Sequence, residues 1–187
     1  MFGRFEEAIR NKQKAIELDP LSLMFNTGLS AALEAARRYD EAMAQCRKTL
    51  ELDSNFAAAH LELGWCFVYK GDTAAAIAEF QKAKSLDPQP WFEGALTYAC
   101  ARAGDRAKAE QMLRDWDDRV KQRYLSPGLR ALLHLGLGEK DKGLDWLEKG
   151  FEEQDGFCCG LKVYPGFDPL RDEPRFQALL KKVGLDK

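Results

Sequence analysis

The sequence predicts an all-α protein, a right-handed α-solenoid of antiparallel helix pairs that closes on a C-terminal capping helix. The first observation is a repeat of about 34 residues, a period typical of solenoids. The second is that apolar residues within each repeat fall on one face of a helix. The third is composition, because 187 residues that are 45% hydrophobic can bury one continuous core.

The repeat unit is a short helix, a tight turn and a second helix. It is clearest at 57–90, which contains a Gly-Asp turn and a closing proline. The turn and the exit of the second helix recur upstream and more loosely downstream, so the period persists while its letters change. The copies lie at 3–20, 37–54, 103–109 and 137–143.

These residues resemble tetratricopeptide repeats. The small residues of that family's first helix match Ser30, Gly64, Thr97 and Ala131, its central alanine matches Ala8, Ala42, Ala76 and Ala109, and its closing proline matches Pro20 and Pro88. The resemblance covers about residues 1–154 and implies a scaffold that binds a protein or peptide partner in a concave groove. The segments 14–22 and 167–176 further resemble C-terminal arrays of bacterial multidomain signalling proteins, which carry a cyclase, a kinase or a winged-helix domain.

The period predicts a single domain over 1–187. Its elements are the second helix of a truncated repeat at 1–20, repeats at 23–56, 57–90, 91–122 and 124–154, an ordered loop at 155–171 and a capping helix at 172–184. Glycines and prolines interrupt the period in the loop, but its many apolar residues predict that it packs on the last helix pair. Apolar residues recur on one face of the final helix, as a cap requires.

The segment 1–20 matches only the second helix of a repeat. The helix that should cover Phe5, Ile9 and Ile16 is missing, so we expect these side chains to be uncovered. Solenoid ends normally carry a polar capping element. The sequence therefore predicts a chain cut at its N-terminus, which can form a homodimer by self-association through Phe5, Ile9 and Ile16.

In the repeat 23–56, Arg37 and Arg38 replace the Gly-Asp of the turn. This replacement is tolerable where the turn needs no left-handed residue. The two charges are interpreted as a solvated surface, and a partner contact is the alternative.

The central repeat carries more aromatic residues than packing requires. First helices line the concave face of such arrays, and large side chains fill the slots that point into the groove. Apolar clusters on a surface tend to mark contacts. The predicted partner-binding groove consists of Leu61, Trp65, Val68, Tyr69, Trp91, Tyr98 and Arg102.

Two other interpretations of the groove aromatics remain open. Trp65 and Tyr98 can pack between neighbouring first helices as core, or the C-terminal segment can fold back and cover them. Arg102 can anchor an acidic group of the ligand or remain solvated. Binding of a chaperone tail is not expected. Some tetratricopeptide domains hold the carboxylate of such a tail with a clamp of lysine, asparagine and arginine side chains. The corresponding positions of this chain hold none of these residue types; they are Thr27, Ala31, Glu62, Trp91 and Ala95.

Five cysteines are present. Cys46, Cys66 and Cys100 fall between helices, where free cysteine behaves as a small apolar side chain. Cys158 and Cys159 are adjacent and seldom bridge, because the geometry is poor. A redox or metal role for this pair is the alternative, although no metal-ligand spacing supports it. Free cysteines favour a reducing compartment, and the predicted localisation is cytoplasmic.

The sequence predicts a non-enzymatic protein-interaction scaffold without cofactors. It has no phosphate-binding loop and no nucleophile motif. The formal net charge is −2, which argues against nucleic acid, and no apolar run is long enough for a membrane helix. The alternatives are a regulatory or sensory segment of a larger signalling protein, a self-association module, and an enzyme in which Cys158 and Cys159 meet His134.

Overall fold

The computed structural model describes residues 4–120 and 126–185, without the side chains of 116–120. The helices are α1 (Phe5–Leu18), α2 (Leu23–Ala35), α3 (Tyr39–Leu52), α4 (Ala57–Lys70), α5 (Thr73–Leu86), α6 (Pro90–Arg102), α7 (Arg106–Val120), α8 (Pro127–Gly136), α9 (Lys140–Glu152) and α10 (Pro174–Lys182), with 3-10 helices η1 (Gly156–Gly160) and η2 (Pro165–Leu170). These ranges contain no strand, so the all-α prediction is confirmed. Among the described helices, none has the length and apolar character to cross a membrane.

The chain divides into two compact units, Gly3–Leu96 and Thr97–Lys187, where the sequence predicts one domain. Helix α6 begins in the first unit and ends in the second. The predicted boundary between the repeats 91–122 and 124–154 lies at 121–125, outside the described residues. The start of the predicted segment 1–20 also lies outside them.

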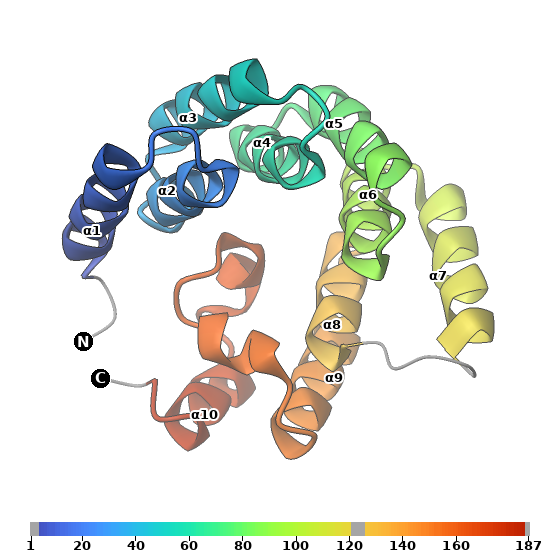
Figure 1. Cartoon of the computed structure of the whole chain (residues 1–187). Helices are drawn as coiled ribbons and strands as arrows, with labels where there is room; N and C mark the ends of the chain where they lie inside the picture. The colour runs from blue at the N-terminus through green and yellow to red at the C-terminus, as the bar shows by residue number, and fades with distance from the viewer. Residues whose placement is uncertain (1–3, 121–125, 186–187) are drawn as a thin grey trace. The chain divides into compact units, whose positions relative to one another are not determined.

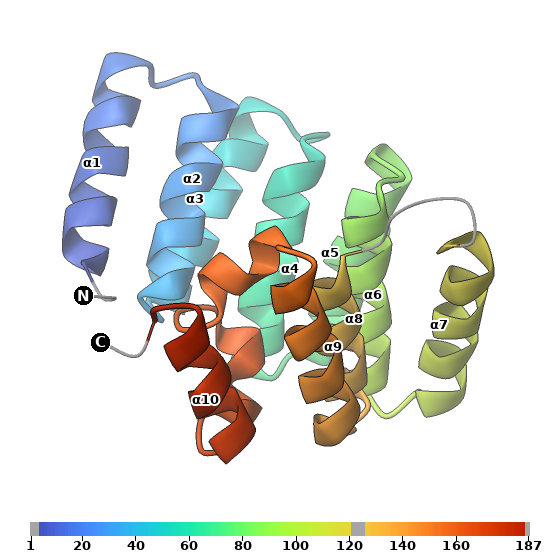
Figure 2. The same ribbon diagram turned by 90° about the horizontal axis from the view of Figure 1, so that it is seen from below.

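The first unit is a curved, two-layer stack of helices. Helices α1, α3 and α5 form the outer layer, and α2 and α4 form the inner layer (Figure 1). Each helix packs on the next in sequence, which is the arrangement that the repeat predicts. The second view shows the same helices side by side along the stack (Figure 2). The continuous core of this stack contains Ile9, Leu29, Leu33, Ala42, Met43, Cys46, Leu63 and Cys66.

A glycine sets the spacing between α4 and α5. A side-chain carbon built on Gly64 would lie 2.4 Å from the ring of Phe80, closer than real contacts allow. Phe80 is fully buried and lies edge-on to Trp65, with ring centroids 5.2 Å apart. The small residue of the first helix is therefore needed because an aromatic ring of the second helix occupies its place.

The structure corrects the prediction of an uncovered N-terminal face. Ile9 is only 2% exposed and joins Leu29 and Leu33 in the core, and Ile16 packs against the same cluster. Phe5 is half-buried. The helix α1 turns its apolar side onto α2, so the residues named for self-association are used for packing within the unit.

The turn between α2 and α3 is also different from the prediction. Arg37 has φ 61°, in the left-handed region where Gly71 lies at the equivalent turn with φ 84°. A left-handed residue is needed here, because the backbone N–H groups of Arg37 and Arg38 bond to carbonyls of Glu34 and Leu33 as the helix ends. Arginine occupies this conformation at an energetic cost that glycine does not have.

Replacing Arg37 with glycine is expected to raise the free energy of unfolding by about 1 kcal/mol, because the left-handed conformation no longer opposes a side chain. Hydrogen exchange of the α2 and α3 amides would measure the change. The matched control is Gly71→Ala, which should lower the free energy of unfolding by a similar amount. A loss of stability in Arg37→Gly would contradict this account of the turn.

In the second unit, α8 and α9 form a pair that the segment after α9 covers. The 3-10 helices η1 and η2 both contact α8, so the segment predicted as an ordered loop is regular over these turns. Asp155 holds it in place: one carboxylate oxygen accepts from the Ser126 hydroxyl at 2.6 Å and from the Gly128 N–H at 2.7 Å. The other accepts from the Phe157 N–H at 3.2 Å.

The last helix packs its apolar face on this segment and on α9. Helix α10 begins at Pro174 with Glu173 as N-cap, slightly inside the predicted range of 172–184. Phe176 is fully buried and its ring lies 6.3 Å from that of Phe167 in η2. On the outer side, Arg175 bonds to Asp145 and Glu148 of α9.

Candidate functional site

The structure distributes the predicted groove residues over both units. Leu61, Trp65, Val68 and Tyr69 lie on α4, and Trp91 lies on the first turn of α6, all in the first unit. Tyr98 and Arg102 lie on the part of α6 that belongs to the second unit. The two groups are therefore described separately.

Trp65 and Val68 do not form an exposed surface. They are 5% and 7% exposed, whereas Leu61 and Tyr69 are half-buried. The ring of Trp65 stacks on that of Tyr69, with centroids 6.0 Å apart. Tyr69 stacks in turn on Tyr39 of α3 at 5.5 Å. These contacts agree with the interpretation of Trp65 as core, because a fully packed aromatic has little surface left for a partner.

The second-unit residues of the predicted groove also differ in exposure. Tyr98 is 5% exposed, and its ring occupies the space beside Gly136 of α8. Burial raises the pKa of the Tyr98 hydroxyl, and Asp168 adds to the effect against the opposing charge of Arg102. Arg102 itself is exposed. Tyr98 is thus a packing residue of its unit.

Exposed apolar side chains occur near the starts of the inner helices and at the ends of the outer helices α1 and α3, where Leu18 and Leu52 are 88% and 45% exposed. Met24 on α2 is 69% exposed and Trp91 on α6 is 50% exposed. The repeat places them at equivalent positions, with Ala58 of α4 between them. They form a row of inner-layer positions in which two of three residues are large, apolar and accessible. We call Met24, Ala58 and Trp91 the inner row.

A second feature of the inner layer is a pair of carboxyl groups. Glu34 of α2 and Glu62 of α4 form a hydrogen-bonding contact, and these helices pack directly on each other. Glu34 is only 4% exposed, and its Oε2 has no hydrogen-bond partner within 4–120 and 126–185. Glu62 is half-buried. We call these two residues the carboxyl pair.

The surroundings of the carboxyl pair favour the protonated form. Burial raises the pKa of Glu34 well above its usual range, and the neighbouring charges of Glu62 and Cys46 raise it further. Burial also raises the pKa of Glu62 to about 7, against the hydrogen bond from Glu34. Two carboxyl groups this close cannot both ionise easily, so the pair holds a proton near neutral pH.

Sequence reasoning missed the carboxyl pair. The sequence identifies neither residue as a site, because a glutamate on a helix is usually solvated. A signal was present, since Glu34 is the only charged residue of α2. The burial depends on side-chain packing between two repeats, which periodicity does not report.

A small polar pocket lies at the turn between α2 and α3. Its volume is about 190 Å³. Its charges are largely neutralised: Arg38 makes two 2.6 Å hydrogen bonds to Glu41, and Lys70 pairs with Asp40. The pocket therefore offers a balanced rather than a basic surface. It is lined by Arg37, Arg38, Tyr39, Asp40, Glu41 and Lys70.

The cysteines and His134 were considered above as alternative functional residues, and the structure shows what surrounds them. All five cysteines are free, and only Cys159 is exposed. Hydrogen bonding to Cys46, with burial, raises the pKa of the Cys66 thiol. His134 Nδ1 lies 2.8 Å from a carboxylate oxygen of Glu139 at the α8–α9 turn. Within the described part of the chain, no three histidine, cysteine or acidic residues gather as metal ligands.

Comparison with protein families identifies the repeat. Two sequence models described as tetratricopeptide repeat match residues 2–55 and 33–94. The first half of the chain, residues 2–94, therefore consists of tetratricopeptide repeats. The matched residues span almost the whole first unit, where the inner row and the carboxyl pair lie. The tetratricopeptide repeat also accounts for the pairing of Gly64 with Phe80 and for the inner and outer helix layers.

Named relatives match slightly less than half of the chain. The Hsp70-Hsp90 organizing protein of Triticum aestivum is 40% identical over 86 residues, which are 46% of this chain and 15% of that protein. The DnaJ homolog subfamily C member 7 of Homo sapiens is 31% identical over 83 residues, which are 44% and 17%. The chain thus spans less than a fifth of the length of these curated relatives.

Solved structures match over nearly the full length. A thermophilic TPR protein of Thermus thermophilus gives a TM-score of 0.66 at 18% identity, covering 96% of this chain and 92% of that one. YrrB, a TPR protein with an unusual peptide-binding site, gives 0.53 at 18% identity, covering 92% and 90%. At these identities the likeness concerns the fold alone, and it confirms the prediction of an α-solenoid.

Proposed function

We propose that this tetratricopeptide repeat protein is a non-catalytic scaffold that binds a segment of a partner protein on the inner helix layer of its first unit. The binding surface consists of α2, α4 and the start of α6. Short helices stacked in two layers expose an inner surface that an extended chain can follow across repeats. The ligand is then held by side chains from successive inner helices.

The inner row is the observation that carries this proposal. Met24 and Trp91 expose 69% and 50% of their surface at equivalent repeat positions. Repeated exposure of large apolar side chains at one position along a solenoid is not needed for packing. Aromatic residues and methionine are enriched in protein interfaces, which supports a contact with a partner here.

The named relatives support a protein ligand but not its identity. They include an Hsp70-Hsp90 organizing protein and a TPR protein with an unusual peptide-binding site. The chaperone-tail clamp needs basic and amide side chains, and this chain has Glu62 and Trp91 at two of its positions. We therefore propose a partner of different chemistry from an acidic chaperone tail.

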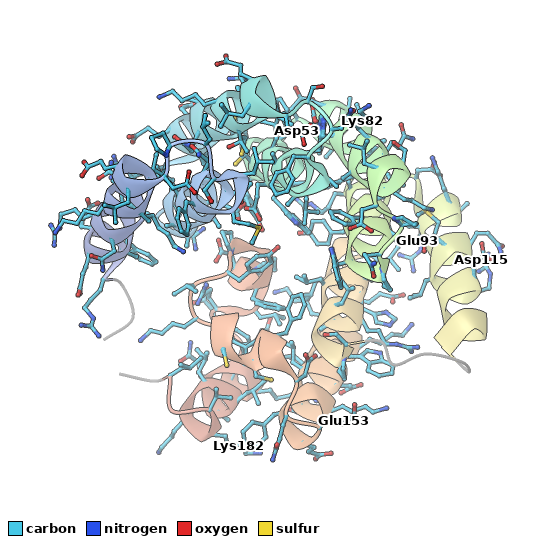
Figure 3. All side chains as sticks on the ribbon, in the orientation of Figure 1. Asp53, Lys82, Glu93, Asp115, Glu153 and Lys182 are labelled. Carbon is cyan, nitrogen blue, oxygen red and sulfur yellow. The ribbon has the colours of Figure 1, made fainter. Side chains whose placement is uncertain are left out.

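Site-specific photocrosslinking tests the proposal. Benzoylphenylalanine is placed at Trp91 on the inner layer, or at Lys82 on the outer side of α5 (Figure 3), and the full chain is irradiated in cells that express it. Crosslinks to one protein segment are expected at position 91 and not at position 82, because only the inner position contacts the ligand.

The segment captured in that way is then synthesised as a peptide. Trp91→Ala is expected to weaken its binding to the full chain at least tenfold, since a buried interface aromatic contributes about 2 kcal/mol or more. Lys82→Ala is the matched control and should leave binding unchanged. Equal crosslinking at both positions, or unchanged affinity in Trp91→Ala, would contradict the proposed surface.

A further inference from the structure

The carboxyl pair is an energetically costly contact between α2 and α4. Burying a carboxyl group without a compensating partner is unfavourable, and burying two in contact is more so. Replacing either with an apolar or amide side chain of similar size would relieve this cost. A pair that weakens the unit while lying on its inner layer is a candidate for recognition.

The buried oxygen of Glu34 points to a missing partner. Oε2 of Glu34 accepts no hydrogen bond from the described residues, although the residue is only 4% exposed. A buried carboxylate oxygen is normally satisfied by a hydrogen-bond donor. The described part of the chain supplies none at this atom, so a donor on a ligand would complete the site.

The inner helices contain no basic side chain that could neutralise the carboxyl pair. Besides the pair, the only charged residue of α2 and α4 is Lys70. The one histidine of these helices, His60, lies with its Nδ1 2.6 Å from a carboxylate oxygen of Glu79. Lys70 pairs with Asp40 of α3. The other titratable groups that face the pair are the thiols of Cys46 and Cys66. The uncompensated charge at this place is negative.

A ligand would approach the pair from the side of Glu62. This residue is half-buried, whereas Glu34 is only 4% exposed. A compact cationic group at the end of a flexible stem fits such an arrangement, since its apolar stem can lie against the neighbouring apolar side chains while its donors meet both carboxylates.

We propose that Glu34 and Glu62 together recognise a cationic side chain, a lysine ammonium or an arginine guanidinium, of the segment bound on the inner layer. This inference rests on the proposed function and specifies the chemistry of the partner. The cation takes the place of the proton that the pair shares in the free protein. The protonated pair and the cation yield the ionised pair bound to the cation, with one proton released to solvent.

Proton release gives the site a pH dependence that an apolar contact lacks. Near pH 6 the pair keeps its proton and the cation must displace it. Near pH 8 a smaller fraction of the molecules carries this proton, so binding of the cation costs less free energy. The affinity for a cationic segment therefore rises with pH across the range around 7, while that for a neutral segment does not.

Short peptides with one variable central residue test the inference. The probes are acetylated, amidated pentapeptides with alanine on both sides of lysine, arginine or norleucine, titrated into the full chain and followed by NMR at pH 6 and pH 8. The lysine or the arginine peptide is expected to bind at least tenfold more tightly than the norleucine peptide at pH 8. The preference should shrink at pH 6, and comparison of the two cations shows which one the site favours.

Isosteric variants assign the preference to the pair. Glu34→Gln and Glu62→Gln are expected to bind cationic and norleucine peptides equally, whereas Glu51→Gln, at an exposed position of α3, should keep the preference. Thermal unfolding of each variant shows that it is folded. Equal binding of the peptides to the unaltered chain, no binding of any peptide, or a preference that survives both variants would overturn the inference. Crosslinking at Trp91 tests the binding surface separately, so either idea can fail alone.

Discussion

Replacing Phe80 with alanine is expected to lower the free energy of unfolding of the first unit by about 3–5 kcal/mol. Phe80 is fully buried, meets Gly64 of α4 and lies edge-on to Trp65 at 5.2 Å. Its loss leaves a cavity between two helices that cannot close, because their backbones are held by the repeat. Hydrogen exchange of the α4 and α5 amides would report the change in this unit alone.

Two further variants make the test specific. Phe151→Ala in the second unit should cost much less, because that ring is 37% exposed. Gly64→Ala should destabilise the native protein, since its methyl group would meet the Phe80 ring at 2.4 Å. In the Phe80→Ala background the same change should become stabilising by about 1 kcal/mol through helix propensity. Additive effects of Gly64→Ala and Phe80→Ala would contradict the packing account.

Glu62→Gln is expected to stabilise the first unit at pH 8 by about 2 kcal/mol, because a neutral amide removes a carboxylate that burial and Glu34 disfavour. Burial raises the folded-state pKa of Glu62 to about 7, above the usual value in an unfolded chain. Between these pKa values the folded state holds more protons than the unfolded state. Stability through this residue is therefore full at low pH and is lost as pH rises towards and through about 7.

The measurement is the free energy of unfolding of the unaltered chain and of Glu62→Gln at intervals from pH 5 to pH 8. The difference between the two should grow with pH across this range. Glu51→Gln provides the control, since this exposed glutamate should leave the pH profile unchanged. A constant difference between Glu62→Gln and the unaltered chain would show that the carboxyl pair does not hold a proton at neutral pH.

The helices of the first unit could be predicted from the repeat. The exposure of the candidate site residues could not, because it depends on side-chain packing. Small residues recur at the positions of Gly64 and Ala76 because two helices must approach closely, and such spacing is visible in the sequence. Trp65 occupies a position that usually faces the groove, yet Tyr69 and Phe80 bury it. Its burial depends on the exact neighbours of one repeat, which the period averages out.

Two other misjudged residues share a cause. An arginine such as Arg37 is expected on the surface, but the C-terminus of α2 requires a left-handed backbone conformation at this residue. Ile9 belongs to a helix without its own partner, and α2 of the next repeat covers it. In both cases the deciding contact is with the following element, and a single repeat unit does not contain it.

A ¹³C NMR titration of the glutamate side-chain carboxyl carbons in the free full chain tests the central claim of a proton-holding carboxyl pair most directly, with Glu62→Gln used to assign the signal. The Glu62 carbon is expected to titrate with a midpoint near 7, as its burial beside Glu34 requires. A midpoint of about 4 to 5, the range of an ordinary glutamate, would contradict the claim.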